Sequence, residues 1–118
     1  MMLGTFVAAQ PFFNDAVTGV PVQVKAGAGQ LFALKLVNTT AATAYLQIFD
    51  LLAAGVTLGT TPAKFTLRLA ANESVTIPMF VPLGLGQLND GAAGISMAGT
   101  TTAAGSTGAA ISVSALFE

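Results

Sequence analysis

LFALKLVN (residues 31–38), TTAATA (39–44) and YLQIFD (45–50) form the stretch that decides the predicted fold. In its first and last parts, apolar side chains recur at every second position. Those that share a face are Phe32, Leu34 and Leu36 in the first part and Leu46 and Ile48 in the last. A period of two in segments rich in branched and aromatic residues indicates β-strands rather than helices. We therefore predict two strands joined by a loop of small residues, with the rest of the chain packed around them.

The connection between these two strands has the length of a longer hairpin loop, so we expect the strands to be neighbours in one sheet. Both faces of the pair are more apolar than a half-solvated hairpin needs. Only Lys35 and Gln47 mark a polar side, and Tyr45 and Phe49 share the side of Gln47. One face should therefore line the core and the other should be covered by something else. The sequence leaves open which face is which.

Further segments of the chain repeat the same alternation, and turn residues separate them. They are residues 20–25, 65–70, 74–81, 92–98 and 110–117. Pro21 and Pro78 favour edge positions or strand starts, because proline cannot donate to a ladder. About seven to eight strands without a substantial helix predict an all-β domain. The expected architecture is an antiparallel β-sandwich with a jelly-roll-like arrangement, or a small barrel.

Residues 1–17 lack a clean period, and we assign them as an N-terminal arm before a single β-sandwich domain at residues 18–118. Three of the eight phenylalanines lie in this arm: Phe6, Phe12 and Phe13. Two interpretations stay open, an edge strand folded onto its own core or an arm that docks on a neighbouring molecule. The arm has no basic start, and its short apolar part ends at Gln10-Pro11, so we expect no secretory signal.

The chain is poor in charge for its length. Its 118 residues suffice for one domain with a real core. Only 8% of them are charged, the net charge is −1 and the mean hydropathy is +0.76, whereas about 25% of residues are charged in an ordinary soluble domain. So few charges leave little to cover the outside, and we infer that much of the surface is buried against other subunits. A monomer with a Thr-, Ser- and Gly-rich surface is the alternative.

Catalytic and metal chemistry lack their usual residues. The chain has no His and no Cys, which removes the commonest catalytic base and the common zinc ligands. The carboxylates are scattered singly, mostly at predicted turns or at the terminus: Asp15, Asp50, Glu73, Asp90 and Glu118. The glycine-rich segment 26–29 leads into a strand and not a helix, so it does not indicate a phosphate loop. We predict that the protein is not an enzyme and holds no cofactor and no metal.

Nucleic-acid and membrane binding are disfavoured as well. Only four residues are basic, too few for a groove that follows phosphates. The longest charge-free run, residues 91–117, is interrupted by five Gly and eight Ser or Thr residues. It does not match the roughly 20 apolar residues that a spanning helix needs. A sugar-binding surface is weakly supported, because the chain has no Trp and one Tyr.

Residues 24–50, VKAGAGQLFALKLVNTTAATAYLQIFD, resemble a segment found in small structural proteins of tailed bacteriophages. In that segment a K-A-small-G-x-L turn leads into a strand, an N-T corner, an Ala-rich loop and a Y-L-x-I/L-F/Y-D strand. The matching residues here are Lys25, Ala26, Gly29, Leu31, Asn38, Thr39, Tyr45, Leu46, Ile48, Phe49 and Asp50. Thr61-Pro62 and FTLRLAANESVTIPM (65–79) also fit, so the resemblance covers about residues 20–81.

The resemblance implies a non-enzymatic virion component, a capsid cement or decoration protein that is made in the host cytoplasm and sits on the capsid surface. It would form a homotrimer, bridge subunits of the major capsid protein and stabilise the head. A tail or fibre-base component, or a receptor- or glycan-binding module of a phage, is the alternative. From the low charge and the apolar strands we expect subunit contacts at Phe6, Phe12, Phe13, Tyr45 and Phe49.

Overall fold

The computed structural model describes residues 10–26, 31–77 and 94–117. These residues form eight strands and one turn of 3-10 helix, η1 (Ala53–Gly55). The strands are β1 (Gln10–Val17), β2 (Val22–Ala26), β3 (Leu31–Asn38), β4 (Ala44–Phe49), β5 (Phe65–Leu69), β6 (Ser74–Ile77), β7 (Gly94–Thr100) and β8 (Ile111–Phe117). The described ranges contain no α-helix. The all-β prediction is therefore confirmed.

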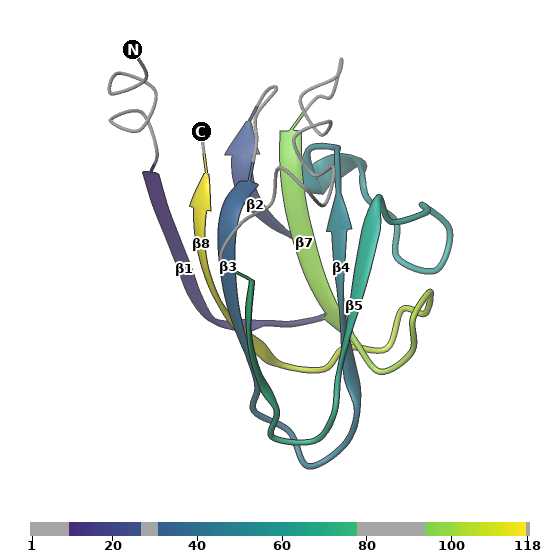
Figure 1. The fold of residues 1–118 in the computed structure, drawn as a ribbon. Helices are drawn as coiled ribbons and strands as arrows, with labels where there is room; N and C mark the ends of the chain where they lie inside the picture. Colours follow the sequence, from purple (N-terminus) through teal and green to yellow (C-terminus); the bar gives the residue numbers. More distant parts are fainter. Residues whose placement is uncertain (1–9, 27–30, 78–93, 118) are drawn as a thin grey trace.

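The strands make two four-stranded antiparallel sheets (Figure 1). Sheet A has the order β1-β8-β3-β6, and sheet B has the order β2-β7-β4-β5. The first strand pairs with the last, the second with the seventh, the third with the sixth and the fourth with the fifth. The chain thus behaves as one long hairpin whose nested pairs are wrapped into two layers. This nested order is the arrangement of an eight-stranded jelly roll.

The two strands of the 31–50 stretch are not neighbours, so the hairpin prediction is wrong. β3 lies between β8 and β6 in sheet A, and β4 lies between β7 and β5 in sheet B. Their connection crosses from one sheet to the other. Because each strand has an apolar face, placing them in opposite layers lets Leu34 and Leu36 face the same core as Leu46 and Ile48. The stretch still organises the fold, since it supplies one central strand to each sheet.

The core lies between the two sheets and is built from the inward faces of their strands. Its fully packed members are Val17, Val24, Leu31, Leu34, Leu36, Ala44, Leu46, Ile48, Leu69, Ile95, Met97, Ile111, Val113 and Ala115. Leu31 joins this face although it was expected on the opposite one. A register shift between Leu31 and Ala33 in the pairing of β3 with β8 accounts for the change. The side chain of Phe32 lies outside the described part.

The N-terminal assignment changes for half of the predicted arm. Residues 10–17 form β1, the edge strand of sheet A, and Val17 is part of the core. The edge-strand interpretation therefore holds for residues 10–17. Residues 1–9 lie outside the described residues, as does the predicted end of the 74–81 strand.

Candidate interaction surface

The chain's own loops cover the central part of the outer face of sheet B, over β4 and β7. From β4, the Gln47 Nε2 atom donates to Thr100 Oγ1 at 2.8 Å and to the Gly105 carbonyl oxygen at 3.2 Å. From β7, Ser96 Oγ donates to the Leu51 carbonyl oxygen at 2.9 Å. These bonds fasten the segments after β4 and after β7 onto the sheet, and all seven residues of β7 are buried. The covering expected over the second face of β4 is therefore supplied by the same chain.

This covering determines whether two predicted contact residues, Phe49 and Tyr45, are accessible to a second molecule. Phe49 is 0% exposed, so its side chain offers nothing to a second molecule, and we withdraw it from the predicted contacts. Tyr45 is half-buried on the same face, in register with Arg68 of β5 on one side and Thr100 of β7 on the other. Tyr45 stays a predicted contact residue, at the margin of a closed face.

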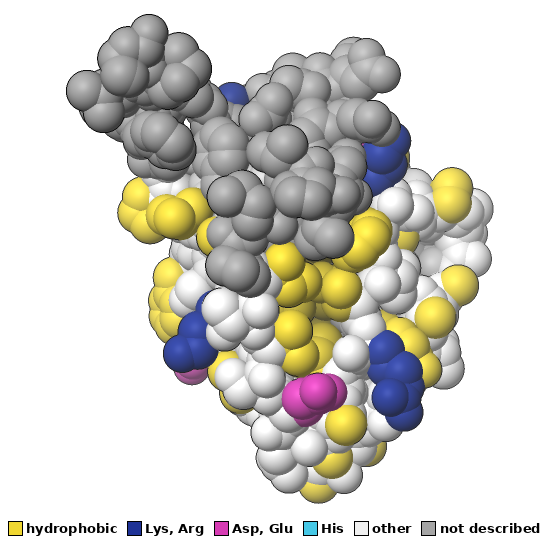
Figure 2. Space-filling view, viewed as in Figure 1, with side chains coloured by type: hydrophobic (Ala, Val, Ile, Leu, Met, Phe, Trp, Pro, Cys, Tyr) yellow, Lys and Arg dark blue, Asp and Glu magenta, His cyan; other side chains and the backbone are white. Residues whose placement is uncertain are grey.

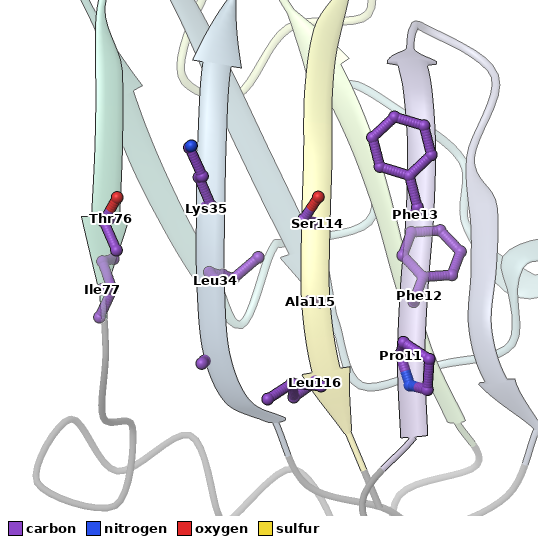
Figure 3. Close-up of a pocket in the computed structure, with 11 residues that line it drawn as sticks. Pro11, Phe12, Phe13, Leu34, Lys35, Thr76, Ile77, Ser114, Ala115 and Leu116 are labelled. Atoms are coloured by element: carbon purple, nitrogen blue, oxygen red, sulfur yellow. The ribbon is translucent and has the colours of Figure 1, made fainter.

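The outer face of sheet A is open and carries two cross-strand rows of side chains. Pro11, Leu116 and Ala33 stand in register across β1, β8 and β3. The next row crosses all four strands of the sheet, as Figure 3 shows. Its members, from β1 to β6, are Phe13, Ser114, Lys35 and Thr76. We call the surface formed by these seven residues the sheet A hollow.

The sheet A hollow is shallow and mostly apolar. The pocket at this surface, which Phe12, Leu34, Ile77 and Ala115 also line, has a volume of about 320 Å³. Phe13 is 65% exposed and Leu116 is 44% exposed, so two large hydrophobic side chains face outward on the same surface. Figure 2 shows hydrophobic side chains over the upper part of β1, where this surface begins. A second hydrophobic group lies between β3 and β5 in the same view. The half-buried residues of β5 and β6 pack against the core, so core packing explains that group.

Charge is placed at the margins of the fold, with one exception. Lys25 is on the edge strand β2, Arg68 is on the edge strand β5, and Lys64 comes just before β5. Charges on edge strands oppose pairing with a foreign strand. Lys64 lies 4.0 Å from Asp50, an exposed pair that contributes little stability. Lys35 is the only charged residue on a central strand in the described part of the chain, and it stands in the sheet A hollow.

The described residues do not converge into a chemical site. Within them there is no group of three or more His, Cys, Asp or Glu side chains that could hold a metal. Every buried side-chain nitrogen and oxygen in this part has a hydrogen-bond partner, so none is left aimed at a ligand. No helix among the residues that could be searched is both long and apolar enough to cross a membrane.

Comparison with known proteins identifies no relative of this chain. Neither a family model, nor a curated protein, nor a solved structure matches this chain. Its function has to be argued from the surface itself.

Sequence reasoning found part of the sheet A hollow. Phe13 was a predicted contact residue and lies in it, whereas Phe12 points to the other face and packs half-buried against the core. Phe6 lies outside the described residues. Leu116 was not among the predicted contact residues. The alternation of β8 could have revealed it, because Ser112 and Ser114 share its face and predict a polar position there.

Proposed function

We propose that this protein is a non-enzymatic structural component of a tailed-bacteriophage particle. In this proposal it is a capsid decoration protein that forms a homotrimer, binds the major capsid protein at the capsid surface and bridges capsid subunits. One observation carries the proposal: the chain's own loops cover the central strands β4 and β7 of sheet B, whereas sheet A presents an open apolar hollow with Phe13 and Leu116 exposed. The resemblance of residues 20–81 to phage structural proteins supports the choice of partner.

Apolar contact suits a chain with so few charges. A standard interface buries about 800 Å² on each partner, and its energy is concentrated in a few desolvated side chains. An exposed aromatic ring beside an exposed leucine gives such a centre, and the surrounding Ser and Thr residues give a polar rim. The jelly-roll order is shared with viral capsid domains and with lectins, and we use it as an analogy only.

Two measurements on the purified protein test the proposal. Light scattering on a sizing column should give about three times the chain mass of 11.8 kDa. The protein should also co-sediment with shells assembled from the major capsid protein of the phage that encodes it. A monomer that leaves such shells unoccupied at micromolar concentration would overturn the proposal.

Phe13→Ser and Leu116→Ser should each weaken binding to these shells by about tenfold or more. Both side chains are exposed, so each change should alter the free energy of unfolding by less than about 1 kcal/mol. Titration of shells with labelled protein, with thermal melts in parallel, measures both effects. Val20→Ser is the matched control, because Val20 is 71% exposed and is not part of the hollow. Equal weakening by all three changes would remove the hollow from the interface.

A further inference from the structure

We infer that the partner surface seated on the sheet A hollow carries one carboxylate set among apolar side chains, and that this carboxylate pairs with the ammonium group of Lys35. The inference rests on the proposed function and names the chemistry of the partner. Three observations carry it: the position of Lys35, the order of the rows around it, and the absence of an anionic neighbour among the described residues.

Lys35 lies between two hydroxyl residues and next to the apolar row of Pro11, Leu116 and Ala33. Its direct cross-strand neighbours are Ser114 of β8 and Thr76 of β6. Neither can neutralise a positive charge. Among the described residues, the only ion pair within 4.0 Å joins Lys64 to Asp50, so Lys35 has no carboxylate partner there. Figure 3 shows Lys35 on the same open face as Phe13 and Leu116.

A partner whose contact extends from Phe13 and Leu116 across Ser114 to Lys35 also removes water from Lys35. Covering an ammonium group without a counter-charge is strongly unfavourable, because its hydration is lost and nothing replaces it. A carboxylate on the partner restores the balance and fixes the orientation of the contact. An uncharged apolar partner would gain less from the same surface.

Other occupants fit the charge pattern poorly. One lysine is too little for a nucleic-acid backbone or an anionic lipid surface, both of which recruit clusters of basic residues. A second copy docked by twofold symmetry with the axis near Lys35 would bring two Lys35 side chains together. A polypeptide surface with an acidic side chain among apolar ones matches the charge and the apolar residues of the sheet A hollow.

The rows also set the spacing of the partner's groups. The row of Lys35 lies between two other rows. On one side is the apolar row of Pro11, Leu116 and Ala33, and on the other is a mainly polar row of Ser112, Val37 and Ser74. Adjacent rows on one face are two residues apart, which is about 7 Å. Leu116 and Lys35 also lie on neighbouring strands, about 5 Å apart, so we expect the partner's apolar anchor and its carboxylate to be separated by about 8 Å. In an extended segment this corresponds to a hydrophobic residue and an Asp or Glu two positions apart.

The experiment compares Lys35 variants in the shell-binding titration. Lys35→Gln should weaken binding by about tenfold or more, Lys35→Glu should weaken it further, and Lys35→Arg should stay within about threefold of the unmodified protein. Lys64→Gln is the control, because Lys64 is a similarly exposed lysine outside the hollow. Since Lys35 is exposed, all four variants should fold, and thermal melts verify this.

The outcomes separate this inference from the proposed function. If the unmodified protein binds shells and Lys35→Gln binds within about twofold of it, the paired carboxylate is wrong and the decoration role stands. Weakening by Lys35→Gln and Lys64→Gln alike would also overturn the pairing, because the effect would then be one of general charge. If the unmodified protein leaves the shells unoccupied, the decoration role fails, and the inference fails with it.

Discussion

Replacing Gly99 by alanine is expected to destabilise the fold by more than about 3 kcal/mol, the largest effect of any small substitution that we predict. A Cβ atom at this position would collide with the carbonyl oxygen of Ala109 and would lie 2.6 Å from the carbonyl oxygen of Val17. Both are backbone atoms, so no side-chain rotation can relieve the contact. The Gly99 amide also donates to the Thr18 carbonyl at 2.9 Å, and its carbonyl accepts from the Ala109 amide at 3.0 Å. Moving the strands apart would break these bonds.

Thermal and urea unfolding of Gly99→Ala measure the effect, and the midpoint temperature should fall by about 10 °C or more for a chain of this size. Gly55→Ala is the matched control, because no atom lies within 4 Å of a Cβ built there and its φ is not positive. That variant should be as stable as the parent or slightly more stable. A loss below about 1 kcal/mol for Gly99→Ala would mean that the junction of β1, β7 and β8 is looser than described.

The Gly99 junction shows why one part of the chain could not be predicted. The run from residue 99 to 108 is rich in Thr, Ala, Gly and Ser and has no period, a composition typical of an exposed loop. Residues 101–104 and 106–108 are indeed exposed, but the Gly105 carbonyl is fastened to β4 by Gln47, and Gly108 lies against Gly19 so closely that a Cβ on either would meet backbone. Small residues permit two backbones to approach closely. The position of the opposing backbone depends on the tertiary structure, so the local sequence does not predict it.

Alternation predicted the strands well and their partners badly. Leu34, Leu36, Leu46 and Ile48 are all fully buried, as the period of two indicates. The alternation shows which face of a strand is apolar. It does not show whether two successive strands pair in the same sheet or pack across the core in opposite sheets. The short 39–43 connection favoured the wrong choice.

The candidate surface was partly predicted for the same reason. Phe12 and Phe13 are adjacent, so they must face opposite ways in a strand, and only a structure shows that Phe13 is the outer one. Phe49 was placed at a contact because it shares a face with Gln47. Phe49 is buried because the chain's own loops pack over that face, and no local sequence pattern predicts this packing. Lys35 was assigned to a polar side, without any sign that Phe13 and Leu116 would be exposed on the same face.

Removing the side chain of Asn38 is expected to destabilise the fold by about 3 kcal/mol, because several buried backbone groups would lose their partners at once. Asn38 is fully buried at the end of β3. Its Nδ2 group donates to the carbonyl oxygens of Ala42 at 2.8 Å, Ala70 at 2.9 Å and Leu69 at 3.3 Å. Its Oδ1 atom accepts from the Thr40 amide at 2.9 Å and from the Thr40 hydroxyl at 2.8 Å. One amide thus joins the loop after β3 to the turn after β5.

Asn38→Ala and Asn38→Asp distinguish this hydrogen-bonding role from simple packing. The aspartate variant keeps the shape and the acceptor but turns an anionic oxygen toward the carbonyls that the amide donates to. Burial and these carbonyls should raise the pKa of the new carboxyl group in the folded state above its unfolded value of about 3.9. Its penalty is then absent below the unfolded pKa and grows as the pH rises through the window up to the folded pKa. Urea unfolding at pH 7 and pH 4 should show Asn38→Asp approaching the parent at the lower pH, while the deficit of Asn38→Ala stays constant. An aspartate variant as stable as the parent at pH 7 would show that this amide does not hold the two loops together.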